Sequence, residues 1–364
     1  MSPSSFHRTW VYLKTRRSVW YYGKVITFAV LLLVGLDRYL GKDIKTYDNV
    51  NLSSQDNMGQ SAQKQSLDEP PQDAQRQAYP EIELGHKFVF AVSARRINHF
   101  NYSFLINEPE ACQSSPELVI IIVGAASNDD RRRAIRETWA NGNRLQTVSN
   151  IILFMVAGTD NTTQKVIRSE SEKFHDILQP SFPDSYETLP LKSVAILKWT
   201  IQYCMSSRFI LKTDDDVYVN IPVLLQLLQA QPNAEFMLGK ENYNISVRRV
   251  PHDKYYISKA QYPYKAFPPY LQGVGYVITT RAVPRLYDAA LHMPLVRLED
   301  VYVGGFCRIR SGVSMIHTEL FKTGFRGGLC DLRSLALLHG YGRRAKLFRM
   351  HRRMTSKLGV CGDK

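Results

Sequence analysis

Apolar runs alternate with helix-like segments from residue 118 onward. The segments Leu118–Gly124 and Ile151–Ala157 are almost wholly apolar, as expected for strands that are buried on both faces of a sheet. A shorter strand is predicted at Arg208–Thr213. The predicted helices, the first of them capped at its start by Asn128, cover residues 128–139, 164–178, 191–204 and 222–230. Because strands and helices alternate, we predict an α/β domain with a mainly parallel central sheet.

The first 100 residues follow a different pattern. Residues 25–36 are apolar and uncharged, and with the aromatic residues back to Val19 they reach the roughly 17–20 residues that a membrane span needs. Basic residues precede this stretch and no small-residue cleavage pattern follows it, so we interpret it as a signal anchor with a cytoplasmic N-terminus. Residues 41 to about 85 have the polar composition of a disordered stem. The predicted order is a cytoplasmic tail at 1–18, a transmembrane helix at 19–39, a lumenal stem at 40–100 and a globular domain at 101–364.

The chain carries a net charge of +14, and much of the excess lies at its two ends. Neither basic run is joined to a recognisable nucleic-acid module, so we favour solvated basic ends over nucleic-acid binding. Four N-x-Ser/Thr sequons support a secretory route. These N-glycosylation candidates are Asn51, Asn101, Asn161 and Asn244. The five cysteines show no zinc spacing, and in an oxidising lumen they allow at most two disulfides and one free thiol, with the pairing open.

Three consecutive aspartates, Asp214–Asp216, follow the predicted strand that ends at Thr213. Ligands in open α/β sheets bind beyond the carboxyl ends of the strands. Adjacent carboxylates repel one another, so a cation would stabilise them. On an extended segment Asp214 and Asp216 point to the same side, which suits one hard divalent ion such as Mg²⁺ or Mn²⁺. The alternative is a solvated turn that caps the next helix, and the position after a buried strand favours the metal.

Two further segments carry candidate chemistry. Glu299 and Asp300 begin an apolar segment that is predicted to be helical, where carboxylates also serve as plain N-caps. A functional role for them requires that this helix points at the triple aspartate. Residues 267–277 contain a Gly-x-Gly-Tyr sequence without a dinucleotide fingerprint, and close approach to a ligand and an aromatic turn are equal alternatives. The tyrosines between residues 255 and 276 suit either stacking on sugars or simple packing.

Taken in order, six segments resemble the β-1,3-glycosyltransferase family of the Golgi, which contains galactosyl- and N-acetylglucosaminyltransferases and is related to the Fringe enzymes. The segments are Phe104–Cys112, Arg132–Trp139, Phe174–Ile177, Lys212–Asn220, Gly273–Tyr276 and Glu299–Gly304. The resemblance covers about residues 104 to 340. It implies a GT-A type nucleotide-sugar-binding domain, a UDP-sugar donor and an inverting transfer that forms a β-1,3 bond.

The resemblance also implies a role for each matching residue. The implied ligands of Mn²⁺ are Asp214, Asp216 and, by its spacing from Cys330, His339. The implied donor-binding residues are Arg132, Arg136 and Asp215. The implied general base is Asp300, which would deprotonate the acceptor hydroxyl. The residues expected near the donor or acceptor are Gly273, Gly275, Tyr276 and Glu299.

The chain departs from the family at Leu271, where the family usually has a cysteine. One family disulfide is therefore in doubt, unless Cys361 re-forms it. Glu299 and the segment at residues 105–109 favour the galactosyltransferase branch, and thus UDP-galactose, with UDP-N-acetylglucosamine as the alternative donor. A catalytically silent lumenal lectin or chaperone on the same scaffold is the other alternative. The implied location is the Golgi membrane, in single-pass type II orientation with a lumenal catalytic domain, and the acceptor on a glycoprotein or glycolipid stays open.

Overall fold

The computed structural model describes residues 95–141 and 150–356, and all of them belong to the unit Gln75–Lys364. The predicted cytoplasmic tail, the transmembrane helix and most of the stem lie outside these residues. Asn51 and Cys361 lie outside them as well. No helix within the described ranges is both long enough and apolar enough to cross a membrane.

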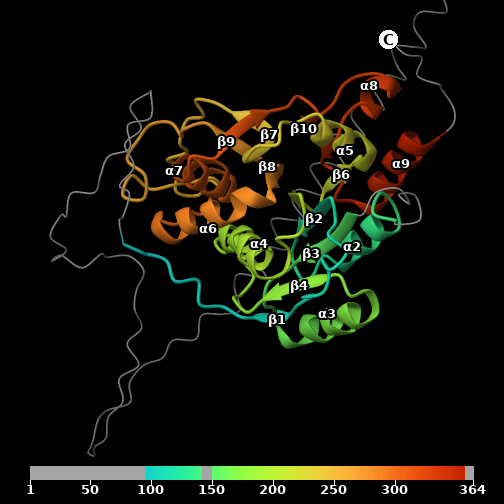
Figure 1. Ribbon diagram of the computed structural model, residues 1–364, viewed down its shortest axis with the longest axis horizontal. Helices are drawn as coiled ribbons and strands as arrows, with labels where there is room; N and C mark the ends of the chain where they lie inside the picture. The colour runs from blue at the N-terminus through green and yellow to red at the C-terminus, as the bar shows by residue number, and fades with distance from the viewer. Residues whose placement is uncertain (1–94, 142–149, 357–364) are drawn as a thin grey trace, which may run out of the picture. The chain divides into compact units, whose positions relative to one another are not determined.

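The described residues form strands and helices in alternation (Figure 1). The strands are β1 (Phe104–Ile106), β2 (Leu118–Val123), β3 (Asn150–Met155), β4 (Ile177–Pro180), β5 (Phe209–Asp214), β6 (Val217–Val219), β7 (Phe236–Asn242), β8 (Tyr270–Thr279), β9 (Ser314–His317), β10 (Phe321–Lys322) and β11 (Leu337–His339). The α-helices are α2 (Asp129–Arg136), α3 (Asn161–Phe174), α4 (Leu189–Tyr203), α5 (Ile221–Gln229), α6 (Val283–His292), α7 (Arg308–Ser311), α8 (Leu329–Arg333) and α9 (Arg344–Thr355). A 3-10 turn, η2 (Thr280–Ala282), and a π-helix, η3 (Val301–Cys307), complete the set.

Eight strands form the central sheet in the order β1-β4-β3-β2-β5-β8-β7-β9. β2 pairs in parallel with β3 and β5, whereas β8 pairs antiparallel with both β5 and β7. The predicted α/β domain is confirmed, but the sheet is mixed rather than mainly parallel. The difference arises at β1, which pairs antiparallel with β4, and at β8. The ten residues of β8 include Gly273 and Gly275 and lack the continuous apolar run that marked β2 and β3. A second sheet has three strands in the order β10-β11-β6.

The helix predicted at residues 164–178 is displaced. α3 begins earlier, at Asn161, because the carboxylate of Asp160 accepts hydrogen bonds from backbone N–H groups of the first helical turn. The helix ends at His175, which adopts a left-handed conformation with φ of 50°. The last predicted helical residues form β4 instead. The other three predicted helices agree with α2, α4 and α5 to within three residues at each end.

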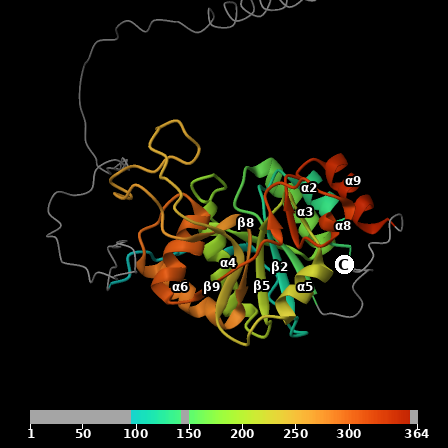
Figure 2. The ribbon, with the colours of Figure 1, turned by 90° about the horizontal axis from the view of Figure 1, so that it is seen from above.

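Alternate residues of β2 pack into different cores. Ile120 packs with residues of α2, α5 and α9, whereas Ile121 packs with residues of α4. Figure 2 shows the sheet between these layers, with α4 and α6 on one side and α2, α5 and α9 on the other. Because both faces of β2 are covered, all six of its side chains are buried, which explains its unbroken apolar sequence.

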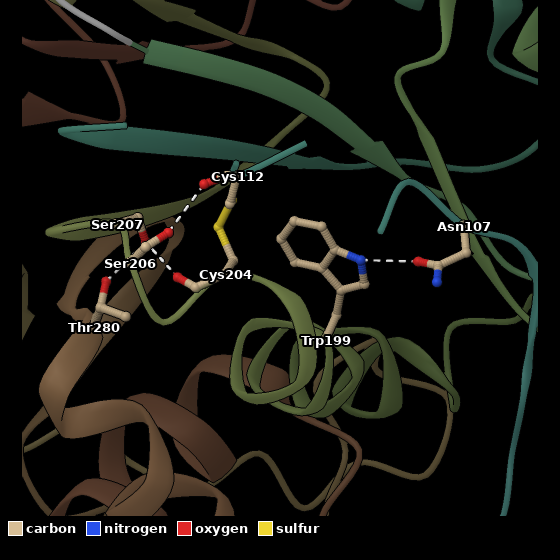
Figure 3. The surroundings of a disulfide bond; sticks show 7 residues. All are labelled: Asn107, Cys112, Trp199, Cys204, Ser206, Ser207 and Thr280. Carbon is tan, nitrogen blue, oxygen red and sulfur yellow. Dashed lines mark hydrogen bonds between the residues drawn. A yellow bond between two sulfur atoms is a disulfide. The ribbon is translucent and has the colours of Figure 1, made fainter. Parts of the chain in front are cut away.

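A disulfide joins Cys112, which precedes β2, to Cys204 at the end of α4 (Figure 3). The hydroxyl of Ser206 donates to the carbonyl oxygen of Cys112 at 3.0 Å. One turn before Cys204, the indole Nε1 of Trp199 donates to Oδ1 of Asn107 at 2.9 Å. The disulfide and these two hydrogen bonds hold the C-terminal end of α4 against the segment that precedes β2.

The remaining cysteine positions bear on the expected family disulfide. Among the described residues, Cys307 is a free and buried thiol. Leu271, which stands where the resembled family has a cysteine, is buried in the same hydrophobic cluster as Cys307. The disulfide suggested for Cys361 concerns a residue outside the described part of the chain.

Candidate active site

A cavity of about 540 Å³ lies at the carboxyl ends of β2 and β5. This is the position where open α/β sheets bind ligands, and the volume is in the range of small-molecule sites. The lining comes from the loop after β2, the start of α3, the start of α4 and the turn after β5. It includes Gly124, Asp160, Asp184, Tyr186, Lys192 and Asp214–Asp216.

The three aspartates have different partners. Asp214 ends β5, but Asp215 and Asp216 form a turn and not the extended segment that we predicted. Asp215 accepts hydrogen bonds from Nδ2 of Asn128 at 2.7 Å and from Nη1 of Arg131 at 2.5 Å. Burial raises the pKa of Asp215 in spite of these two partners. Because the side chain of Asn128 is engaged here, it does not cap α2 as predicted.

The structure places His339 beside Asp216. β11 pairs antiparallel with β6 so that His339 lies opposite Val217, and Nε2 of His339 is 3.3 Å from Oδ2 of Asp216. The backbone N–H groups of Gly340 and Tyr341 donate to the carbonyl oxygen of Asp216 at 3.0 and 2.7 Å. The hydrogen bond with Asp216 raises the pKa of His339. Burial acts to raise the pKa of Asp216, but the hydrogen bond with His339 and the charges of His339 and Arg131 together outweigh burial and lower it.

Lys212 joins the triple aspartate to the second acidic segment. Its Nζ lies 3.0 Å from Oδ1 of Asp214 and 2.9 Å from Oε2 of Glu299, and its side chain is 2% exposed. Nζ also donates to the carbonyl oxygen of Gly273 at 2.7 Å. Burial acts to lower the pKa of Lys212, but the two carboxylates outweigh burial and raise it. Glu299 also accepts a hydrogen bond of 2.5 Å from the hydroxyl of Tyr276, so the second segment lies directly beside the first.

Asp300 immediately precedes η3. One oxygen accepts a hydrogen bond from the N–H of Val301 at 2.9 Å, and the other lies 3.3 Å from the backbone nitrogen of Gly273. Burial, together with the negative charge of Glu299, raises the pKa of Asp300 to about 6. Tyr186 lines the cavity, and its pKa is raised to about 12. The main cause is burial, and nearby groups that include Asp300 add to it. Asp300 therefore has the titration range of a general base, although it is not among the described residues that line the cavity of about 540 Å³.

The glycines of β8 make room for protein atoms. A Cβ on Gly273 would lie 3.3 Å from Cβ of Asp300, and a Cβ on Gly275 would lie 2.5 Å from Cδ2 of Leu337. The segment is a strand, so the aromatic turn that we weighed for it does not form. Within the tyrosine-rich stretch, Tyr262 is buried in the core and therefore packs.

Arg132 and Arg136 are not part of the cavity lining as far as the described residues show it. Arg132 is 2% exposed and donates to both carboxylate oxygens of Glu170, at 2.9 and 2.7 Å. It also donates to the carbonyl oxygen of Ala125, which lines the cavity. Arg136 forms ion pairs with Glu170 and Asp176. Their contact with a donor stays a prediction, and in this structure Arg132 supports the cavity wall.

The charges of the site favour a cation. Three carboxylates interact with the ammonium group of Lys212, namely Asp214, Glu299 and Asp300, and Asp216 lies close enough to Asp214 to affect its pKa. Burial raises the pKa of Asp214 to about 6, and Glu299 and Asp216 reinforce the rise against Lys212. The carboxylate of Asp216 and the imidazole of His339 are a donor set that Mn²⁺ accepts. In the described ranges no three His, Cys, Asp or Glu side chains converge on one metal position, so the structure presents a pair of candidate ligands rather than a complete set.

Lys212, Arg131 and Lys192 make contacts in the site that we did not assign from the sequence. Lys192 is 2% exposed, and its Nζ lies 2.6 Å from Oδ1 of Asp184 and 2.8 Å from the carbonyl oxygen of Gly124. For Lys212 a signal existed, since a charged residue inside an apolar strand must find a partner when it is buried. Arg131 and Lys192 lie in helical segments where charged residues are ordinary, so the sequence held no comparable signal.

Comparison with known proteins identifies relatives of this chain. Residues 130–319 match the galactosyltransferase family. The chain is 32% identical over 256 residues to beta-1,3-galactosyltransferase 1 of Mus musculus and of Homo sapiens, a match that covers 68% of this chain and 77% of the relative. It is 29% identical over 233 residues to beta-1,3-galactosyltransferase 5 of Pan paniscus, which covers 62% of this chain and 77% of the relative.

Solved structures add only a distant likeness. The galactosyltransferase LgtC in complex with donor and acceptor sugar analogs is 13% identical and aligns with a TM-score of 0.34, covering 67% of this chain and 98% of that one. A similarity of this size supports no conclusion about fold or function.

An α/β domain with a carboxylate-lined cavity at the ends of its parallel strands is the framework of a ligand-binding enzyme. The sequence matches make the class specific: the chain belongs to the galactosyltransferase family, among relatives that are β-1,3-galactosyltransferases. The family resemblance inferred from the six ordered segments is confirmed.

Proposed function

We propose that the chain is an inverting β-1,3-galactosyltransferase that transfers galactose from UDP-galactose to a sugar acceptor on a glycoprotein or glycolipid. Family membership supports the reaction type. The observation that carries the mechanism is the contact of Lys212 with both Asp214 and Glu299, which sets the base candidate Asp300 beside the aspartate turn. We propose a GT-A type domain in which the cavity at the ends of β2 and β5 holds the donor.

In the proposed reaction Asp300 acts as the general base. With a pKa of about 6 it is mostly ionised at neutral pH, so it accepts the proton of the acceptor 3-hydroxyl as that oxygen attacks the anomeric carbon. The N–H groups of Gly273 and Val301 orient its carboxylate. UDP leaves from the opposite face of the sugar, and because no protein carboxylate bonds to the sugar, the anomeric configuration inverts.

We propose Asp214, Asp216 and His339 as the residues that hold Mn²⁺, with Asp216 as the direct ligand. Their fit rests on the 3.3 Å approach of His339 to Asp216 and on the negative charge of Asp216 near that of Asp214. When bound, the ion supplies positive charge to the diphosphate of the departing UDP. Asp215, held by Arg131, is proposed to lie near the nucleoside.

A donor panel tests this proposal. UDP release is measured with UDP-galactose, UDP-N-acetylglucosamine and other UDP-sugars in the presence of Mn²⁺, with galactose-, N-acetylglucosamine- and N-acetylgalactosamine-terminated acceptors. Transfer from UDP-galactose is the expected result. Transfer from UDP-N-acetylglucosamine alone would show that this sugar nucleotide, and not UDP-galactose, is the donor. If no UDP-sugar were hydrolysed or transferred, the lectin or chaperone alternative would be favoured.

Two variants separate the proposed roles. Asp300→Asn should bind UDP-galactose nearly as well as the wild type while the rate of transfer falls about 10²–10⁴-fold. Asp216→Ala should lose the Mn²⁺-dependent part of UDP binding, measured by isothermal titration calorimetry with and without the metal. Transfer by Asp300→Asn at the wild-type rate would show that another group is the base.

We also propose that the chain is a single-pass type II protein of the Golgi membrane, with residues 40–100 as a stem and residues 101–364 in the lumen. The apolar stretch at residues 19–39 supports the anchor, and the exposed positions of Asn101, Asn161 and Asn244 suit glycosylation. When the chain is expressed in secretory cells, each asparagine-to-glutamine substitution should lower its apparent mass by one N-glycan, and endoglycosidase treatment should remove the same mass from the unsubstituted chain. If the chain carried no such glycan, the lumenal topology would be contradicted.

A further inference from the structure

The C-terminal helix α9 has two chemically different faces. Leu347 and Met350 are buried in the core that also contains residues of α2 and α8 (Figure 1). The basic face, which includes the residue before the helix, consists of exposed cations: Arg343, Arg344, Lys346, Arg349, Arg352 and Arg353. The basic end that we interpreted as solvated is therefore a docked helix whose cations face outward. The sequence contains no acidic residue between Asp331 and Asp363.

Most of the basic face lacks neutralising partners. Arg344 forms an ion pair of 2.8 Å with Glu137, and Nζ of Lys346 lies over the ring of Tyr341. The other four arginines form no ion pair with any described residue: Arg343, Arg349, Arg352 and Arg353. A row of unpaired guanidinium groups attracts anions, and each group matches the geometry of a carboxylate, phosphate or similar oxyanion.

One end of α9 adjoins the candidate metal ligands. The N–H of Tyr341 donates to the carbonyl oxygen of Asp216 at 2.7 Å. A Cβ on Gly342 would lie 2.9 Å from Cβ of Asp216 and 3.1 Å from Cζ of Arg131. The basic face begins at the next residue, Arg343. Since α9 has 12 residues, the face extends about 18 Å from this edge.

A second cavity, of about 330 Å³, lies at the other end of α9. We call it the α9 cavity, and its lining includes Trp139, Tyr218, Arg333, His351 and Thr355. Trp139 is 6% exposed, and its indole nitrogen is itself buried, so the residue contributes ring surface to the cavity wall. The hydroxyl of Tyr218 and Nδ1 of His351 are 3.1 Å apart. Aromatic side chains next to cations are features that bind a sugar ring bearing an acidic group.

We propose that the acceptor is an acidic glycan, bearing sulfate or uronate groups, that lies along the basic face between the catalytic site and the α9 cavity. This inference rests on the proposed galactosyltransferase function and names the acceptor class. The basic face supplies charge complementarity along the chain, and the α9 cavity takes one sugar residue. A flat layer of phosphatidylserine would meet the same cations but has no sugar ring to place in the cavity, so the geometry points to the glycan.

Direct binding tests the inference without requiring turnover. The full chain in detergent is titrated into a fluorescent sulfated tetrasaccharide, and into the same tetrasaccharide without sulfate, and fluorescence anisotropy is measured. We expect binding of the sulfated form only, weakening as salt is raised. The variant Arg349→Gln/Arg352→Gln/Arg353→Gln should raise the Kd about tenfold. The matched control Lys165→Gln/Arg168→Gln/Lys173→Gln removes the same charge from the exposed side of α3 and should change the Kd less than about twofold.

A second variant tests the α9 cavity. His351→Ala removes a partly exposed ring that lines this cavity, and it should weaken binding of the sulfated tetrasaccharide severalfold while the α3 control does not. Equal loss in the α9 and α3 triple variants would overturn the inference, since only net charge would then matter. Binding to phosphatidylserine vesicles without binding to the sulfated tetrasaccharide would also overturn it.

The outcome for the acceptor is separable from the outcome for the enzyme. UDP release from UDP-galactose in the absence of acceptor should be the same in the α9 triple variant and in the wild type. If UDP release is present but the sulfated tetrasaccharide does not bind, the acceptor inference fails and the proposed function stands. If the sulfated tetrasaccharide binds but no UDP-sugar is hydrolysed or transferred, the proposed function fails.

Discussion

Replacement of Lys212 by methionine isolates the charge that holds the two acidic segments together. The side chain is 2% exposed, and its Nζ contacts Asp214 at 3.0 Å and Glu299 at 2.9 Å. Methionine has a similar length and fills most of the same volume without a charge. The substitution therefore removes the ion pairs and leaves most of the packing.

The expected loss of stability follows from the buried carboxylate that remains. Glu299 is 3% exposed, and breaking a buried ion pair by removing one partner costs about 3–5 kcal/mol. Domains have a total stability of about 5–15 kcal/mol, so this is a large fraction. At about 2–4 °C per kcal/mol for a large domain, the melting temperature should fall by roughly 6–20 °C.

Urea unfolding and thermal unfolding, both followed by tryptophan fluorescence, measure this loss. The double variant Lys212→Met/Glu299→Gln removes the orphaned charge as well and should recover at least half of the lost stability. The exposed Lys265 provides a control, and Lys265→Met should change stability by less than about 0.5 kcal/mol. If the free energy of unfolding of Lys212→Met is within about 1 kcal/mol of the wild-type value, the loss is no larger than that of a surface contact. The ion pairs would then not hold the site together.

Three other outcomes follow from the same structure. Because burial raises the pKa of Asp300 to about 6 and a base must be ionised, kcat/KM should rise with pH up to about 6 and then level off. In Asp300→Asn this rise with pH should be absent, and the rate should be about 10²–10⁴-fold lower than in the wild type. Gly275→Ala places a Cβ 2.5 Å from Cδ2 of Leu337 and should lower the free energy of unfolding in urea by about 1–3 kcal/mol. The control Gly324→Ala, whose added carbon has no atom within 4 Å, should leave it nearly unchanged. Replacing both cysteines of the Cys112–Cys204 disulfide by alanine should lower the free energy of unfolding by about 2–5 kcal/mol, since the bridge closes a sequence separation of 92 residues; an unchanged urea midpoint would contradict this.

The strands that are buried on both faces were predictable, and β8 was not. β2 and β3 show continuous apolar runs because layers of helices cover both sides of the sheet. β8 contains glycines where Asp300 and Leu337 approach its backbone, so its sequence resembles a loop. The parallel strands β2, β3 and β5 were therefore visible in the sequence, whereas the antiparallel pairing of β8 with β5 and β7 emerged only in the fold.

The sequence indicated several candidate residues of the site but not their contacts. The ordered segments pointed to Asp214, Asp216 and Asp300, and spacing from Cys330 pointed to His339. The turn at Asp215 and Asp216, and the separate partner of each carboxylate, depend on atoms brought in by other elements. The local pattern of apolar and polar residues does not predict such partners, because they lie far apart in the sequence and meet only in the folded chain.

The sequence by itself determined the α/β class, the apolar layers and the family, because these depend on local periodicity and on the order of motifs along the chain. Only the tertiary structure decided that Lys212 joins Asp214 to Glu299 and that His339 meets Asp216. It also decided that the basic C-terminal residues form a docked helix which starts beside that site. These contacts join residues far apart in the chain, so they arise from strand pairing and from the compensation of buried charge, which are properties of the folded molecule.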